Sequence, residues 1–370
     1  MSNIFITGGT GFLGSDLICE ILNSSSNHIY ALVRARNITH ARRKLFNILE
    51  KLSQPRGLNR AARKRIHVYK GDITRKNLDL KRNDLNKLVK TIDVIFHSAA
   101  STNLKSPLKK IRRINVNGTK RVLDFALLCQ RKGRLKKVYH ISTVYVAGTK
   151  ICTFKEKDLN IRQGFNNPYE RSKFEAEQLI HRYRKRGIDI SIFRPSIMLG
   201  RYKDGISTRF KMLYQPLHFL SFELIDTLPV IKEGKPNLIN VDIAAKTIML
   251  ISQMNHRKNK TYHITSPDAL PLSYVLGMAS KFFGFKNPRL APPNSIDMNK
   301  DYTPVKRKII EPYLPYFNYL TKFDMKNTLD QIKKTNFVFP QLNKKNLYRL
   351  FKYCDEVGFI KKKRKNVVEK

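Results

Sequence analysis

Short apolar runs alternate with amphipathic segments over residues 1–200. The runs predict buried strands, and segments whose apolar positions recur every three to four residues predict helices. The predicted strands are residues 3–7, 28–34, 66–70, 94–98, 137–142 and 189–194. The predicted helices are residues 11–22, 39–52, 111–130 and 169–186. This alternation indicates an α/β fold with a doubly wound parallel sheet (Rossmann fold) covered on both faces.

The pattern changes after Pro195, where prolines become frequent and strands rare. Beyond it we predict one strand at residues 261–264, an irregular stretch at 287–316, and helices at 242–252, 273–283, 324–333 and 343–357. We therefore expect a dinucleotide-binding domain over residues 1–200. A smaller, mainly helical substrate-binding part follows over residues 201–370, interleaved with the sheet edge where ligands bind in such folds.

The charge is strongly positive, with 72 Lys and Arg against 28 Asp and Glu and a net charge of +44. Such a field attracts anionic partners, although a basic bias of the whole proteome is the alternative explanation. The basic residues are spread along the chain, whereas nucleic-acid binders concentrate them, so we predict no specific nucleic-acid partner. The basic tail at residues 361–370 is either solvated or in peripheral contact with an anionic membrane.

Targeting and redox signals are few. Cys19, Cys129, Cys152 and Cys354 show no pair spacing, which indicates free thiols in a reducing cytosol. The chain has no run of eighteen apolar residues and no signal-peptide pattern at its start. We expect a cytoplasmic protein without a metal site.

A glycine-rich turn follows the first strand and opens the first helix. Gly8 permits a tight turn, Gly11 lets the backbone approach a pyrophosphate, and Gly14 lets the helix pack closely on the strand. The N-terminus of the helix adds free N–H groups and partial positive charge. We predict a nicotinamide dinucleotide bound here. The predicted contacts are Gly8, Thr10, Gly11, Phe12, Leu13 and Gly14.

The end of the second strand indicates which dinucleotide binds. NAD enzymes usually place a carboxylate there for the ribose 2′-hydroxyl, but this strand ends in Arg34 and the next helix carries Arg43. A guanidinium matches a 2′-phosphate in charge and geometry, which favours NADPH over NADH. The alternative is that these arginines reflect only the general basic bias.

Other strand ends supply further cofactor contacts. Asp72 can accept from the adenine amino group with Ile73 packed on the ring, although Asp72 is nearly as plausible as a turn carboxylate. Small residues after the fourth strand let the cofactor lie against the backbone, while His97 is expected to be structural. The segment after the sixth strand offers backbone contacts to the carboxamide of the nicotinamide. The remaining predicted contacts are Ala99, Ala100, Pro195 and Ser196.

Tyr169 and Lys173 lie four residues apart on one helix face. A tyrosine has a pKa of about 10 and is a poor acid or base at neutral pH. A nearby ammonium lowers that pKa, and Lys173 can also bond the nicotinamide ribose. A hydroxyl at the end of the fifth strand, from Ser142 or Thr143, can orient Tyr169 and hold a substrate carbonyl. We predict carbonyl reduction with Tyr169 as the proton donor.

In the order and spacing of these motifs, the chain resembles the extended short-chain dehydrogenase/reductase superfamily over about residues 3–200. The matching segments are residues 7–14, 71–73, 97–100, 115–119, 142–143, 169–173 and 194–196. The resemblance implies a catalytic Ser/Thr–Tyr–Lys group and places Thr143 in the hydroxyl position. Asn115 matches the asparagine of the superfamily's Asn-x-x-Gly-Thr motif.

Within the superfamily, the chain looks most like the thioester reductase and fatty acyl-CoA reductase group. Residues 31–34, 240–244 and 262–265 are similar to that group, although Asn240 stands where it usually has proline. The resemblance implies NADPH-dependent reduction of an acyl thioester, with acyl-CoA or an acyl carrier protein as the substrate. The alternatives are a nucleotide-sugar epimerase or dehydratase, which Arg34 disfavours, and a non-catalytic dinucleotide sensor, which the intact catalytic group disfavours.

Overall fold

A computed structural model of the chain describes residues 1–54, 57–231, 234–254 and 258–363. The chain forms two compact units, which we describe separately. Unit 1 comprises Met1–Ser196, Ala244–Thr265 and Lys322–Val338. Unit 2 comprises Ile197–Ile243, Ser266–Thr321 and Phe339–Lys370. The predicted basic tail lies outside the described residues from Arg364 onward.

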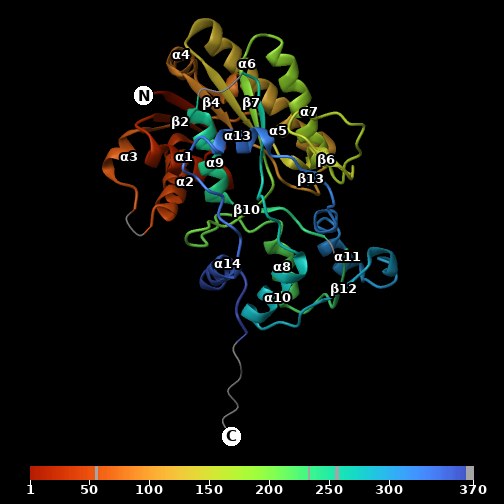
Figure 1. The fold of residues 1–370 in the computed structure, drawn as a ribbon. Coiled ribbons are helices and arrows are strands. Elements are labelled where there is room, and N and C mark those ends of the chain that lie inside the picture. The colour runs from red at the N-terminus through yellow and green to blue at the C-terminus, as the bar shows by residue number, and fades with distance from the viewer. Residues whose placement is uncertain (55–56, 232–233, 255–257, 364–370) are drawn as a thin grey trace. The chain divides into compact units, whose positions relative to one another are not determined.

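Unit 1 is built on a seven-stranded, fully parallel sheet with the order β3-β2-β1-β4-β5-β7-β11 (Figure 1). Its strands are β1 (Asn3–Thr7), β2 (His28–Val33), β3 (Ile66–Lys70), β4 (Val94–His97), β5 (Lys137–Ile141), β7 (Ile190–Pro195) and β11 (Thr261–Ile264). All six strands predicted in residues 1–200 are present, within one residue at each end. The predicted doubly wound α/β fold is therefore confirmed.

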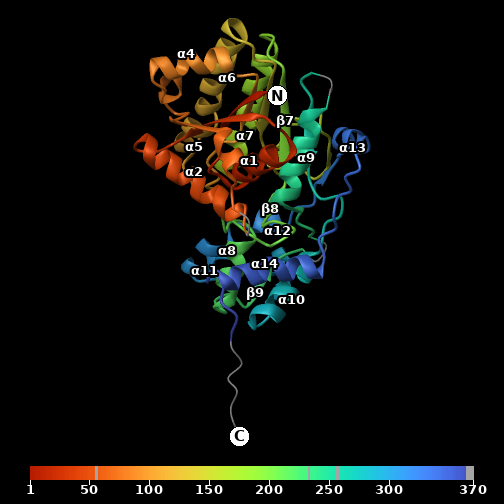
Figure 2. The same cartoon turned by 90° about the vertical axis from the view of Figure 1, so that its left-hand side faces the viewer.

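The helices of unit 1 lie against this sheet (Figure 2). They are α1 (Phe12–Ser24), α2 (Ile38–Leu52), α3 (Arg60–Lys64), α4 (Arg82–Thr91), α5 (Leu108–Asn115), α6 (Asn117–Lys132), α7 (Pro168–Arg184), α9 (Val241–Gln253) and α13 (Lys326–Ile332). Helices α4, α5, α6 and α7 pack on one another, and α1 packs on α2. The core between sheet and helices is apolar, and Phe5 of β1 meets Phe125 of α6 with ring centroids 5.0 Å apart.

The single helix predicted over residues 111–130 is wrong at Val116, where the chain breaks into α5 and α6. The Asn115 side chain accepts from the Ser101 N–H at 2.7 Å and donates to the Ser101 carbonyl at 3.0 Å. It also donates to Ser172 of α7 at 2.9 Å. These bonds tie the end of α5 to a loop and to α7 at the point where the helix is interrupted.

Unit 2 contains short helices and two small parallel strand pairs. The helices are α8 (Tyr214–Ser221), α10 (Leu272–Phe283), α11 (Pro304–Ile310), α12 (Leu314–Phe317) and α14 (Lys344–Glu356). The strand pairs join β8 (Ile197–Leu199) to β10 (Leu238–Asn240) and β9 (Thr227–Pro229) to β12 (Arg289–Ala291). The region predicted to be irregular, 287–316, therefore holds a strand and helical turns.

The chain first leaves unit 1 after Ser196, close to the boundary expected near residue 200, but it returns twice. It returns because β11 completes the large sheet beside β7, and because β13 (Lys322–Phe323) pairs with β6 (Thr153–Phe154). In the described part of the chain, no helix is both long and apolar enough to cross a membrane. All four cysteines are free, as predicted.

Candidate active site

The turn between β1 and α1 requires glycine at two of its positions. Gly8 has a φ of +78°, and a Cβ there would lie 2.5 Å from the Ala99 nitrogen. A Cβ on Gly14 would lie 2.1 Å from the Gly8 carbonyl oxygen. The Gly11 N–H donates to the same oxygen at 2.8 Å, which closes the turn. Backbone atoms therefore pack so closely against Gly8 and Gly14 that no side chain fits at either position.

The start of α1 is suited to an anion. No side chain caps it and its first turn carries no acidic residue, so the first N–H groups are available to a ligand. A Cβ on Gly11 would meet only the Gly8 oxygen, at 3.0 Å, so this backbone is otherwise open. Thr10 and Phe12 are half-buried here, whereas Leu13 points into the core. An open glycine backbone at an uncapped helix start fits a dinucleotide pyrophosphate.

The basic segment after β2 is exposed and has few partners. Arg34 and Arg43 are both exposed, and neither guanidinium has a hydrogen bond or ion pair with any described residue. Burial lowers the pKa of nearby His40, and the cations Arg36, Lys44 and Arg43 lower it further. The local field is therefore positive and can accept an additional phosphate.

The segment after β3 holds the two residues predicted to contact the adenine. The Asp72 carboxylate accepts from the Thr74 N–H at 2.8 Å, as a turn carboxylate does, through only one of its oxygens. Ile73 is 8% exposed and lies in the core cluster, where a Cβ on Gly118 would be 2.7 Å from its Cδ1. The Ile73 side chain therefore packs on α6, which leaves it little surface for an adenine ring.

The end of β4 is held by His97, which is structural as expected. Its Nδ1 lies 2.7 Å from the Thr7 hydroxyl and its Nε2 lies 3.0 Å from the Thr119 hydroxyl. Burial, with a smaller effect of Lys173, lowers the pKa of His97 to about 3, so the ring is neutral. The Ala99 N–H donates to Thr7 at 3.3 Å, while the neighbouring Ala100 is exposed. This network fixes the backbone that faces the glycine turn.

The three predicted catalytic side chains meet at the end of β5. Thr143 directly follows Ser142 beyond the strand, and its hydroxyl acts on the phenol of Tyr169, in the first turn of α7, by lowering that group's pKa. The Lys173 ammonium, one turn later, donates to the Ile141 carbonyl at 2.7 Å. The structure therefore brings Thr143, Tyr169 and Lys173 to one sheet edge, and Thr143 rather than Ser142 acts on the Tyr169 phenol.

The charge states differ from the expectation that Lys173 would lower the pKa of Tyr169. Burial raises the pKa of Tyr169 to about 12, the Thr143 hydroxyl lowers it partly, and Glu170 raises it. Burial lowers the pKa of Lys173 to about 8, against which Glu177 acts. In this state Tyr169 is a neutral phenol at pH 7, which suits a proton donor, and Lys173 is mostly protonated.

The predicted backbone contacts after β7 are mostly occupied. The Ser196 N–H donates to the Ile264 carbonyl at 3.1 Å, and the Pro195 carbonyl accepts from Thr143 at 3.2 Å. The buried hydroxyls of Ser142 and Ser196, in contrast, have no hydrogen-bond partner among the described residues. Buried hydroxyls usually have partners. The Ser196 hydroxyl, rather than the backbone, is therefore available to form a hydrogen bond with the nicotinamide carboxamide at this edge.

One buried ion pair was missed by the sequence reasoning. Arg194 of β7 donates to both carboxylate oxygens of Glu177 on α7, at 2.7–3.2 Å, and both side chains are buried. Arg194 also donates to the Asp158 carbonyl at 2.8 Å and lies 3.2 Å from Nε2 of His263. The sequence signal that could have indicated this pair is Arg194 itself, an arginine inside an otherwise apolar strand. The pair fixes α7, and with it Tyr169, to the sheet.

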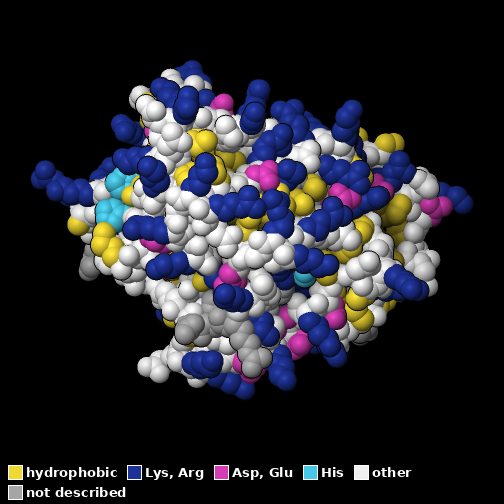
Figure 3. Space-filling view, turned by 90° about the horizontal axis from the view of Figure 1, so that it is seen from above, with side chains coloured by type: hydrophobic (Ala, Val, Ile, Leu, Met, Phe, Trp, Pro, Cys, Tyr) yellow, Lys and Arg dark blue, Asp and Glu magenta, His cyan; other side chains and the backbone are white. Residues whose placement is uncertain are grey.

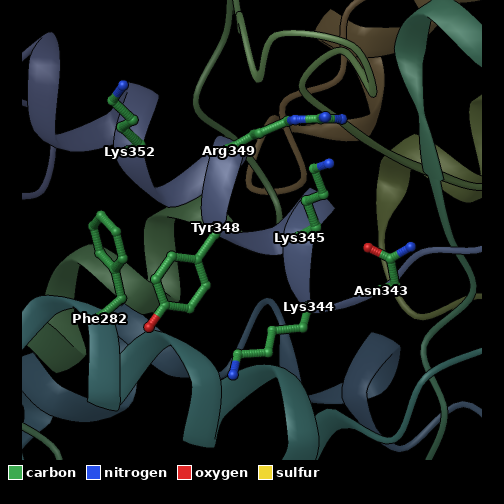
Figure 4. A pocket seen from close by; sticks show the side chains of 7 residues that line it. All are labelled: Phe282, Asn343, Lys344, Lys345, Tyr348, Arg349 and Lys352. Carbon is green, nitrogen blue, oxygen red and sulfur yellow. The ribbon is translucent and has the colours of Figure 1, made fainter.

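A groove of about 650 Å³ lies on unit 2, and Figure 4 shows its lining. Its residues are Phe282, Asn343, Lys344, Lys345, Tyr348, Arg349 and Lys352. Phe282 and Tyr348 meet edge to face at 5.2 Å, but the cationic ends point in different directions (Figure 4). Because these charges do not converge, we assign no ligand to the groove. Basic side chains are also spread over the face shown in Figure 3, with few acidic ones between them.

The fold and this site define an NAD(P)-binding reductase of the short-chain dehydrogenase/reductase type. The family model described as "Male sterility protein" matches residues 6–248, and the chain belongs to that family. This membership confirms the resemblance inferred from the motifs.

Known relatives include a linear gramicidin synthase subunit and a fatty acyl-CoA reductase. A linear gramicidin synthase protein of Brevibacillus parabrevis is 27% identical over 271 residues, covering 71% of this chain but 5% of that protein. A fatty acyl-CoA reductase of Drosophila melanogaster is 27% identical over 58% of this chain and 46% of its own length. The solved terminal R domain of the myxalamid pathway has the same fold, with a TM-score of 0.84, 23% identity, and coverage of 98% and 93% of the two chains.

Proposed function

We propose that the protein is an NADPH-dependent reductase of acyl thioesters. The observation that carries the proposal is the convergence of Thr143, Tyr169 and Lys173 at the end of β5, with Lys173 anchored on the Ile141 carbonyl, in a unit that also holds the glycine turn. Membership of the reductase family and the similarity to a fatty acyl-CoA reductase support the choice of substrate.

The residues proposed to hold the cofactor divide by the part they would bind. The turn from Gly8 to Gly14 takes the pyrophosphate, and Arg34 with Arg43 takes the 2′-phosphate. Lys173 binds the nicotinamide ribose. The backbone at Ala99 and Ala100 and the Ser196 hydroxyl face the rest of the nicotinamide half. Asp72 keeps one carboxylate oxygen for the adenine. When bound, NADPH supplies a hydride to the thioester carbonyl carbon.

The chain's own groups handle the proton. When substrate binds, the Thr143 hydroxyl turns from the Pro195 carbonyl to donate to the substrate carbonyl oxygen, and Tyr169 donates its phenolic proton to that oxygen as negative charge develops there. Hydride and proton together convert the thioester to a hemithioacetal, which collapses to an aldehyde and a free thiol. The Lys173 ammonium stabilises the phenolate that Tyr169 leaves behind. The aldehyde is then either released or converted to an alcohol by a second round of hydride and proton addition, which consumes a second NADPH.

The thiol half of the substrate is coenzyme A or an acyl carrier protein. Both are anionic, and the net charge of +44 favours their approach. The same field would favour peripheral contact with an anionic membrane, which long-chain acyl substrates also approach.

The test is NADPH consumption by the purified protein with long-chain acyl-CoA, with an acyl carrier protein loaded with the same chain, and with nucleotide sugars. We expect oxidation with at least one thioester and none with the sugars. Turnover of a nucleotide sugar without thioester reduction would establish the epimerase or dehydratase alternative instead.

A further inference from the structure

A second buried histidine lies beside the catalytic lysine. His140 of β5 is 1% exposed and stands in register with His97 of β4, with the two rings 5.2 Å apart. Its Nε2 lies 3.3 Å from the Lys173 ammonium nitrogen, which also donates to the Ile141 carbonyl. Two consecutive residues of one strand therefore engage two of the three ammonium protons.

His97 cannot serve the lysine in the same way, because both of its nitrogens are committed. The Thr119 hydroxyl donates to the Asn115 carbonyl at 2.6 Å, so its oxygen accepts from the His97 Nε2–H. The Nδ1 of His97 then accepts from the Thr7 hydroxyl. Among the described residues, the imidazole that contacts the Lys173 nitrogen is that of His140.

The hydrogen bond to Lys173 fixes the tautomer of His140. Burial, and then the charge of Lys173, lowers the pKa of His140 well below its usual value, so the ring is neutral. A neutral ring that accepts at Nε2 carries its proton on Nδ1. That Nδ1 is buried and has no hydrogen-bond partner among the described residues. Such an unpaired donor costs about 1–3 kcal/mol, so packing alone does not account for a histidine here.

We propose that His140 is the positioning residue of Lys173: with the Ile141 carbonyl it fixes two ammonium protons and directs the third at the cofactor ribose and Tyr169. A neutral imidazole anchors the ammonium without adding a negative charge beside the hydride donor. The proposal rests on the proposed function, because it assigns a role to Lys173 during turnover.

Among the described residues, the charge of Lys173 is coupled to Glu177 on its own helix and to His140 and His97 on the sheet. Tyr169 lies one turn earlier on the same helix. Glu177 is held by Arg194 and favours the ammonium. Replacing His140 leaves Tyr169, Glu177 and His97 in place, so a changed titration of Lys173 reports the lost contact with His140.

The experiment compares His140→Leu, which has no acceptor, with His140→Gln, whose amide oxygen can accept from Lys173. The control is His67→Leu, a histidine of β3 that pairs with His28 at the far part of the sheet. The readouts are kcat and KM against pH, and NADPH affinity by fluorescence. For His140→Leu we expect kcat to be at least about 10-fold lower and the thioester KM to be unchanged. The fall of kcat at alkaline pH, called the alkaline limb, should be centred about one pH unit lower. His140→Gln and His67→Leu should keep the limb near that of the unmodified protein.

A tautomer measurement tests the same idea on the unmodified protein, even if a variant fails to fold or no thioester is turned over. ¹⁵N NMR of histidine-labelled protein at pH 7, assigned with His140→Gln, should show His140 protonated on Nδ1. An Nε2–H tautomer would overturn the proposal. So would a wild-type pH profile in His140→Leu, or a His140→Gln profile shifted as far as that of His140→Leu. Absence of any thioester reduction with the Nδ1–H tautomer present would count against the proposed function alone.

Discussion

The Glu177→Gln substitution probes the attachment of the catalytic helix to the sheet. Glu177 is fully buried on α7 and accepts from the Arg194 guanidinium at 2.7–3.2 Å, with Arg194 itself 1% exposed. The substitution keeps the size of the side chain but removes its charge. Arg194 is then a buried cation without its counter-charge, in contact with neutral groups such as the new amide, His263, the Asp158 carbonyl and the Phe154 ring.

The magnitude follows from the burial of both partners. Breaking a buried ion pair by removing one partner costs about 3–5 kcal/mol, because the remaining charge stays out of water. At roughly 2–4 °C per kcal/mol, the melting temperature should fall by about 6–20 °C. Glu177 also favours the ammonium of Lys173, whose pKa is already lowered to about 8 by burial. Its loss should therefore move the alkaline limb of turnover to lower pH.

The assay is thermal unfolding together with a pH profile of turnover, and Glu175→Gln is the matched control. Glu175 lies two residues earlier on the same helix and is 20% exposed in its ion pairs with Arg112 and Arg171. Exposed pairs contribute about 0–1 kcal/mol, so the control should shift the melting temperature little. Equal shifts in both variants would refute the reasoning that burial of the Glu177 pair decides its importance.

Three further substitutions or conditions test other parts of the site. Arg34→Ala should weaken NADPH binding by about 10–100-fold and leave NADH binding within about 2-fold, since a charged hydrogen bond contributes about 1.5–3 kcal/mol. Equal losses for both cofactors in a fluorescence titration would count against the 2′-phosphate assignment. Gly14→Ala should abolish NADPH binding in the same titration, because its Cβ would lie 2.1 Å from the Gly8 oxygen; tight binding would show that the turn can open. Turnover should fall as the pH rises through about 8, where Lys173 loses its proton, and a rate constant to pH 10 would contradict the need for the ammonium.

The sheet and the catalytic group could be predicted because each has a local signal. Buried parallel strands are continuous apolar runs, and the glycine turn and the Tyr169–Lys173 spacing lie within single segments. The break at Val116 could not be read from periodicity, because it depends on bonds from Asn115 to residues distant in sequence. The place of Thr261–Ile264 in the large sheet likewise depends on its long-range pairing with β7.

The features of the site that sequence reasoning did not foresee have the same origin. Ile73 was predicted to contact the adenine because it follows a strand end, and its close packing on Gly118, from α6, could not be read from that position. The pKa of Tyr169 was expected to fall because of Lys173, whereas burial raises it to about 12 in the folded chain. The roles of Glu177 and His140 arise only from tertiary contacts, so no spacing in the sequence indicated them.

The central claim is hydride transfer from NADPH to a thioester carbonyl with Tyr169 as the proton donor. The direct measurement is mass spectrometry of the product formed from long-chain acyl-CoA and NADPH deuterated at both C4 positions. We predict an aldehyde with one deuterium at C1, or an alcohol with two, and no labelled product from Tyr169→Phe despite nearly normal NADPH binding. NADPH oxidation without deuterium at C1, or undiminished product formation by Tyr169→Phe, would contradict the account.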